Sequence, residues 1–228
     1  MIANKKYFYS GLVLMFLFGA ILIVIFSPVF GGQNGLKYLD NLYNSISKGS
    51  AYYIPKVRKE AEKFSGSNVN LLFSMHDKTR AQQVAGQFQK NGAQVVLADE
   101  KIRLSGDLGK ILSQILDDSD LMYYNKGREL SEKYGIKEKE VLYNWWIALL
   151  GMDKDLKAKS KFAEAKVIDL LRKKAVESSF NYYGIEPQKI TDRMGIVIFS
   201  LIFYVIYTLW YGYAILYMME GWGLRLEH

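Results

Sequence analysis

The sequence predicts an α+β membrane protein, in which two transmembrane helices flank a mostly helical extramembrane domain with a small three-stranded β-α-β-β-α unit. Two long apolar segments, Leu12–Phe30 and Gly195–Met219, predict the transmembrane helices. The charged sequence between them has helical periodicity over most of its length, and strand-like runs occur only within residues 69–104.

These patterns divide the chain into consecutive segments. In order, they are a short N-terminal tail (1–10), a first transmembrane helix (11–30), a membrane-proximal helical segment (31–66), a small α/β unit (67–125), a helical segment (126–186), a helix continuing into the second transmembrane helix (187–219) and a C-terminal tail (220–228).

The first apolar segment is expected to be an anchor. Lys5 and Lys6 precede it as in a signal sequence, but the run is about 19 residues long and ends without an A-x-A cleavage pattern. We therefore expect an uncleaved helix. Its small residues Gly11, Gly19 and Ala20 are places where a tyrosine ring of another helix could lie against the backbone.

The second apolar segment has no charged residue and, at about 1.5 Å per residue, is long enough to cross the roughly 30 Å hydrocarbon core of a bilayer. Five hydroxyl side chains fall within about one third of its circumference, a hydroxyl stripe made of Ser200, Tyr204, Tyr207, Thr208 and Tyr211. Because an unpaired hydroxyl is costly in lipid, we expect the stripe to face protein. Packing against a helix is favoured, and the lining of a pore or quinone channel is the alternative.

The sequence after the first apolar segment predicts helices and then the β signal. Helical spacing over residues 36–64 is followed by a strand at Val69–Met75, a helix at Asp77–Lys90, a hairpin from residues 93–97 and 101–104, and a helix capped by Asp107. The strand-helix-strand order resembles the peptidoglycan-binding SPOR domain. Helices replace the repeat that would supply its fourth strand, so we do not assign that family.

The rest of the central region predicts helices only. We expect them at Lys126–Tyr134, Lys137–Leu150 and Asp153–Tyr183. Pro187 suits the first turn of a helix, which we expect to continue without a break into the second transmembrane segment.

Basic residues beside the apolar segments suggest an orientation. Lys5 and Lys6 favour a cytoplasmic N-terminus, whereas Lys189 and Arg193, against Arg225 alone on the far side, favour the opposite orientation for the second segment. Because the first helix usually dominates, we expect a two-span protein of the cell inner membrane. Its domain is then periplasmic or extracellular.

Few residues suit catalysis or cofactor binding. With no cysteine and two histidines, the chain lacks ligand sets for haem, structural zinc or iron–sulfur clusters, so we expect no cofactor, no metal and no enzyme activity. His76-Asp77 could form a base with its orienting acid, but a residue pair at a helix start is the favoured interpretation.

Three further patterns have structural interpretations that we favour. Asp117, Asp118 and Asp120 could hold Ca²⁺, but a solvated helix face pairing with Lys126 or Arg128 is favoured. Asp107 caps a helix and would repel an anion there. Between positions 154 and 174, acidic residues interrupt a run of basic residues, and no aromatic residues alternate with the basic ones. This pattern predicts a solvated helix face and no nucleic-acid binding.

Together these features favour a non-catalytic integral-membrane subunit whose extramembrane domain docks on a larger membrane assembly. Its expected partners are membrane lipid and other membrane subunits or copies of itself. The alternative is a homo-oligomeric two-span channel or pore-like protein, with the hydroxyl stripe facing the path. Neither apolar segment contains Asp, Glu, Lys, Arg or His, which argues against a proton relay or an ion-coupled transporter.

Overall fold

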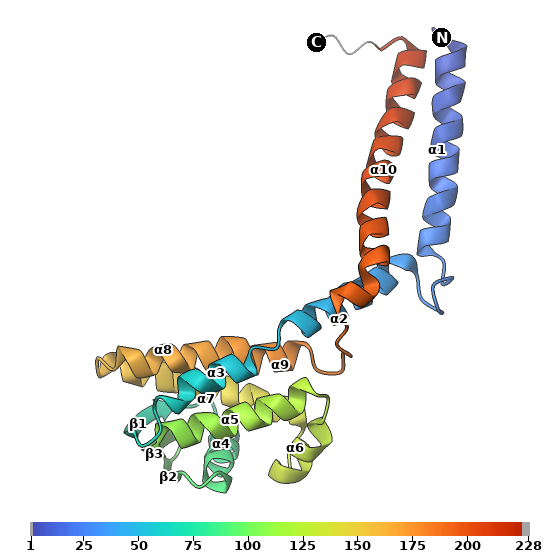
Figure 1. Ribbon diagram of the computed structural model, residues 1–228. Helices are drawn as coiled ribbons and strands as arrows, with labels where there is room; N and C mark the ends of the chain where they lie inside the picture. Colours follow the sequence, from blue (N-terminus) through green and yellow to red (C-terminus); the bar gives the residue numbers. More distant parts are fainter. Residues whose placement is uncertain (1, 225–228) are drawn as a thin grey trace. The chain divides into compact units, whose positions relative to one another are not determined.

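The chain folds into two units, which the computed structural model describes over residues 2–224 (Figure 1). Unit 1 combines the residues up to Ser47 with those from Pro187 onward, and unit 2 is Lys48–Glu186. Arg225, used in the orientation argument, lies outside the described residues, as do the last three residues of the chain.

Unit 1 is built on two long helices, α1 (Lys5–Phe26) and α10 (Ile190–Trp222), which run side by side in opposite directions (Figure 1). Asn4 caps α1, because its side chain accepts a hydrogen bond from the Tyr7 backbone N–H. The amphipathic helix α2 (Gly35–Ser50) begins in the same unit. Both long helices are apolar and long enough to cross a membrane.

The start of α10 corrects one expectation from the sequence. Residues 182–189 are not helical, and α10 begins at Ile190, so Pro187 does not lie in its first turn. The left-handed conformation of Gly184 and the restriction that Pro187 places on Glu186 interrupt helical geometry here. No unbroken helix therefore leads from the last helix of unit 2 into α10.

Unit 2 contains the predicted three-stranded sheet. Its strands are β1 (Asn68–Ser74), β2 (Gln94–Ala98) and β3 (Lys101–Asp107), in the order β1-β3-β2 and antiparallel throughout. Helix α4 (Lys78–Lys90) connects β1 to β2, and β3 leads directly into α5 (Leu108–Tyr123). Alternate residues of β1 are buried, as expected for a sheet with helices on one face. The predicted β-α-β-β-α order is therefore confirmed.

The other helices of unit 2 complete one hydrophobic core around Trp145. They are α3 (Ile54–Glu62), α6 (Gly127–Tyr134), α7 (Glu138–Ala158), α8 (Phe162–Leu171), a π-helical turn η1 (Arg172–Val176) and α9 (Glu177–Asn181). The helix expected to end at Leu150 continues to Ala158, because Met152 and Leu156 still face the core. The break falls instead around Ser160, which has a left-handed backbone.

The C-terminal part of α7 protects the outer edge of β1. Asp155 accepts a hydrogen bond from the Leu72 backbone N–H at 3.1 Å, and Lys159 donates one to the Asn70 carbonyl at 2.7 Å. Two side chains thus pair backbone groups of an edge strand that could otherwise pair with another strand. The outer edge of β1 is therefore covered by α7.

Candidate functional site

The candidate site lies in unit 1, where α1 meets α10. At one end the helices touch through small residues. A Cβ atom added to Gly11 would lie 2.7 Å from the Met218 backbone nitrogen, and one added to Gly221 would clash with the Phe8 backbone. The Asn4 N–H also donates to the Gly221 carbonyl at 2.9 Å. Close backbone approach at small residues is the usual geometry of helix pairs in membranes.

Aromatic side chains form the next layer of contact. Phe18 is buried, and its ring stacks on Tyr207 with centroids 4.7 Å apart and packs against Tyr211 at 5.3 Å. The Trp210 indole N–H donates to the Leu14 carbonyl at 3.1 Å. Side chains of α10 thus pack on α1 and also satisfy one of its backbone carbonyls.

The hydroxyl stripe divides between different environments. Ser200 Oγ is 2.6 Å from the hydroxyl of Tyr43 on α2, and Thr208 Oγ1 donates to the Tyr204 carbonyl one turn earlier at 2.8 Å. The side chains of Tyr204 and Tyr211 remain 67% and 46% exposed. Among the described residues, neither of these two phenol hydroxyls has a hydrogen-bond partner.

The face of α10 that contacts α1 is rotated from the hydroxyl stripe by about 60°, at 100° per residue. It is centred on Tyr207, Trp210, Ala214, Met218 and Gly221. Tyr207 belongs to both sets, and Tyr211 also touches Phe18 of α1. Sequence reasoning missed the other four, although Ala214 and Gly221 are small residues seven positions apart and could have indicated the contact face. On α1, Gly11 packs against Ala214 and Met218 and not against a tyrosine ring, and a Cβ atom added to Gly19 would meet no other residue within 4 Å.

A cavity of about 700 Å³ lies beyond the aromatic layer, between the later part of α1, the start of α2 and the first half of α10. Apolar side chains such as Ile21, Ile25, Leu39 and Phe203 form most of its wall. Ser200, Tyr204 and Tyr207 of the hydroxyl stripe also line it. Three of the five residues of the hydroxyl stripe thus lie at this cavity.

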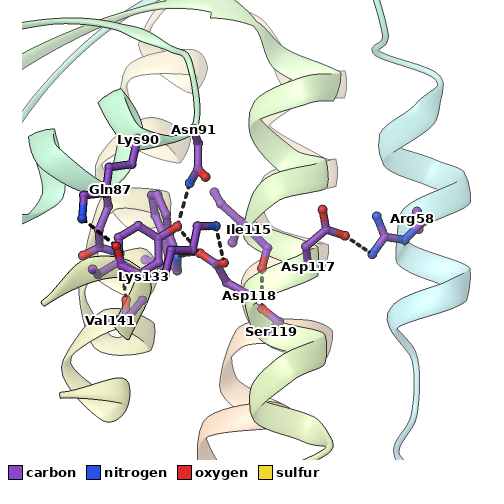
Figure 2. Close-up of polar contacts among 12 residues, drawn as sticks. Arg58, Gln87, Lys90, Asn91, Ile115, Asp117, Asp118, Ser119, Lys133 and Val141 are labelled. Atoms are coloured by element: carbon purple, nitrogen blue, oxygen red, sulfur yellow. Dashed lines mark hydrogen bonds and ion pairs between the residues drawn. The ribbon is translucent and has the colours of Figure 1, made fainter. Parts of the chain in front are cut away.

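The acidic cluster of unit 2 is a structural network (Figure 2). Adjacent carboxylates point to opposite sides of α5, with Asp117 paired to Arg58 at 2.7 Å and Asp118 fully buried. Asp118 accepts hydrogen bonds from Lys133, Tyr134 and Trp145 at 2.6–2.9 Å. Burial and the nearby Asp118 carboxylate raise the pKa of Tyr134 far above its ordinary value.

The expected partners of these acids were therefore wrong. Lys126 and Arg128 do not pair with them, and Asp120 instead accepts a hydrogen bond from Tyr52 at 2.8 Å. Asp118 does not belong to a solvated face, because the following helices α6 and α7 fold over it. Among the described residues no group of three His, Asp or Glu side chains is arranged to hold a metal ion.

The two predicted helix starts have the geometry of caps. Asp77 accepts a hydrogen bond from the Arg80 backbone N–H at 2.7 Å, and His76 beside it is exposed. Asp107 accepts from Lys110 N–H at 3.1 Å and from Gly66 N–H at 2.8 Å. These backbone donors hold the pKa of Asp107 below its ordinary range. The interpretation of Asp107 as a cap is confirmed, and Asp77, expected at a helix start, is the cap of α4.

Most of the basic residues between positions 154 and 174 form ion pairs within unit 2. The pairs join Lys157 to Asp153, Lys159 to Asp155, Lys161 to Glu164, Lys173 to Asp169, and Arg172 to both Asp169 and Glu177. This pattern agrees with the interpretation as a charged helix face.

A second polar network, not anticipated from the sequence, joins the two ends of unit 2. Lys48 is fully buried, and its Nζ donates to the Ile185 carbonyl at 2.6 Å and to Asn125 Oδ1 at 3.1 Å. Asn125 has a left-handed backbone and also donates to Glu186 at 2.8 Å. Burial lowers the pKa of Lys48 below its ordinary value of 10.5.

Nothing among known proteins extends these observations: no family model, no curated protein and no solved structure matches the chain.

Proposed function

We propose that this protein is a non-catalytic integral-membrane subunit, anchored by α1 and α10, whose extramembrane unit docks on a larger membrane assembly. Both long helices expose large apolar side chains. Phe16 and Ile23 on α1 and Phe199 on α10 are 77%, 69% and 66% exposed. A helix that is apolar around its whole circumference needs an apolar surrounding, and bilayer lipid provides one.

The observation that carries the subunit role is the exposed part of the hydroxyl stripe outside the cavity, Thr208 and Tyr211. Tyr211 is 46% exposed and lies within about 6 Å, along the helix axis, of the middle of the apolar segment. At that depth no interfacial water can solvate a phenol hydroxyl, so a partner helix is the favourable neighbour. Thr208 and Gly212 are spaced four residues apart, and a Cβ atom added to Gly212 would meet no other residue within 4 Å. Such small residues allow a second helix to approach closely.

Unit 2 contributes a second surface suited to docking. On the outer face of the sheet, Arg103 is paired in register with Leu72 on one side and Val96 on the other. Leu72 and Val96 are exposed. An apolar pair around a central arginine is the composition favoured in protein interfaces. We propose this face as the contact of the domain with its assembly, on the periplasmic or extracellular side that the N-terminal lysines favour.

The test is the mass and composition of the complex purified gently from its native membrane. We expect other subunits in a fixed ratio to this chain. Several copies of this chain alone would favour the alternative, a channel or pore-like homo-oligomer.

Substitution separates the two proposals further. Replacing Tyr204, Tyr207 and Tyr211 together by Phe should release the partners if the hydroxyl stripe packs against helices. Loss of conductance with an intact assembly would favour a pore. Tyr213→Phe, on the opposite face of α10, is the matched control and should change neither property.

A further inference from the structure

The cavity of unit 1 has the length and lining that suit a flexible hydrocarbon chain. Its wall on α10 runs from Ile196 to Trp210, a length of about 21 Å at 1.5 Å per residue. Its volume is about 700 Å³, and the side chains that line it are almost all apolar.

Two polar groups in the cavity wall are paired within the protein. Ser200 is bonded to Tyr43, and the Trp210 indole N–H to the Leu14 carbonyl. The remaining surface is mainly aliphatic and phenyl carbon. An occupant inside the cavity thus meets hydrocarbon, and its polar part must lie at an end of the cavity.

Basic residues lie at one end. Arg193 precedes Ile196 by three residues and Ser200 by seven, a spacing that places it on the cavity face of α10. On α2, Lys37 lies between Leu36 and Tyr38, which both line the cavity. Neither Arg193 nor Lys37 forms an ion pair with a carboxylate in the described part of the chain. Arg193 donates to Gln188 at 2.8 Å.

Acidic residues in the same segments reduce this positive charge without cancelling it. Asp40 follows the lining residue Leu39, and Asp192 lies in the first turn of α10. The three basic residues Lys37, Lys189 and Arg193 and these two aspartates together carry a net charge of about +1 at this end of the cavity. An anionic headgroup is favoured there over a zwitterionic one.

We propose that this cavity is a binding site for one anionic phospholipid, with an acyl chain between α1 and α10 and the headgroup phosphate beside Arg193 and Lys37. The inference rests on the proposed insertion of unit 1 in a membrane. It adds a specific ligand and the residues that select it.

Tryptophan quenching tests the site directly, because Trp210 lines the cavity. The full chain is placed in phosphatidylcholine vesicles that contain brominated phosphatidylglycerol or brominated phosphatidylcholine. The emission lost in Trp210→Phe identifies the Trp210 signal. We expect brominated phosphatidylglycerol to quench Trp210 half-maximally at a mole fraction about fivefold lower than brominated phosphatidylcholine does. A factor of about five corresponds to the attraction of one basic residue for an anionic membrane surface.

Two pairs of variants separate the headgroup from the chain. Arg193→Gln should abolish the preference for the anionic lipid, and Lys6→Gln, at the other end of the helix pair, should keep it. Ala20→Phe places a ring in the cavity wall and should reduce quenching by both lipids. Val13→Phe, an exposed position outside the cavity, should leave quenching unchanged.

Alkaline carbonate extraction of the same vesicles distinguishes the two possible failures. A chain that stays in the membrane pellet but shows equal quenching by both lipids would overturn the anionic-lipid site and leave the proposed insertion intact. A chain that carbonate removes from the vesicles would overturn the insertion and the site that rests on it.

Discussion

Phe18 of α1 stacks on Tyr207 of α10, with ring planes 25° apart. This contact lies between the small-residue end of the helix pair and the cavity. It therefore holds the helices together at the point where close packing gives way to a space large enough for a lipid chain.

Phe18→Ala should weaken the helix pair. It removes the stacked ring and its contact with Tyr211, and aromatic pairs of this kind contribute about 0.5–1.5 kcal/mol. We expect the variant to lose the Trp210 fluorescence of the packed state at a lower mole fraction of sodium dodecyl sulfate. Phe16→Ala, an exposed position on α1, is the control, and equal shifts for both variants would contradict this role of Phe18.

Asp118→Ala should be far more damaging than Asp117→Ala. Removing the buried carboxylate leaves the Trp145 indole and the Tyr134 hydroxyl without their acceptor, and we expect a loss of about 3 kcal/mol in the free energy of unfolding. The exposed pair of Asp117 with Arg58 should be worth less than about 1 kcal/mol. Urea unfolding followed by circular dichroism measures both values. Similar losses would show that the Asp118 network does not stabilise unit 2.

Asp107 should give unit 2 a pH-dependent stability. Because its pKa is lowered in the folded state, its contribution is complete above the ordinary value of 3.8 and is lost as the pH falls through the lower folded pKa. Asp107→Ala should cost about 1 kcal/mol at pH 7, and the difference from wild type should shrink below pH 3.8.

Asp107→Asn is the matched control for that series, because an amide oxygen can still cap α5. It should retain most of the stability at pH 7 without the acid dependence. Urea unfolding at several pH values measures the series. A constant difference between wild type and Asp107→Ala down to acid pH would contradict this account.

Asn125 should be the critical residue where the two ends of unit 2 meet. Asn125→Ala loses the hydrogen bonds to Lys48 and Glu186 and places alanine in a left-handed backbone, which together should cost about 3 kcal/mol. Asn125→Gly keeps the backbone conformation and should recover about 1 kcal/mol of that loss. Thermal unfolding of both variants measures the difference. Equal stability of the two would show that the left-handed backbone contributes nothing.

Local patterns in the sequence were enough to predict the small sheet, the helix start at Asp77, the cap at Asp107 and the two long apolar helices, because these depend on neighbouring residues. The contacts of Asp118 and Lys48 could not be predicted in this way. Their partners are up to 137 positions away in the sequence, and a carboxylate looks the same in a sequence whether a later helix covers it or not. The break after Ala158 was misplaced for the same reason, since burial of Leu156 extends α7.

The contact face of α10 is a second feature that local sequence patterns did not predict. Periodicity groups Tyr204 and Tyr211 on one face of α10, but it does not indicate which face of α10 meets α1. Small residues decide that question here, through Gly11, Ala214 and Gly221. The identity of the partner of the stripe remains a prediction from chemistry.

Photo-crosslinking at Tyr211 tests the central claim most directly. Tyr211→p-benzoylphenylalanine keeps an aromatic side chain on the uncovered face, and the same substitution at Tyr213 places the probe on the opposite face as a matched control. In native membranes we expect position 211 to form an adduct with another polypeptide and position 213 to react with lipid. Lipid adducts alone at both positions would contradict the proposal that this face of α10 binds a protein partner.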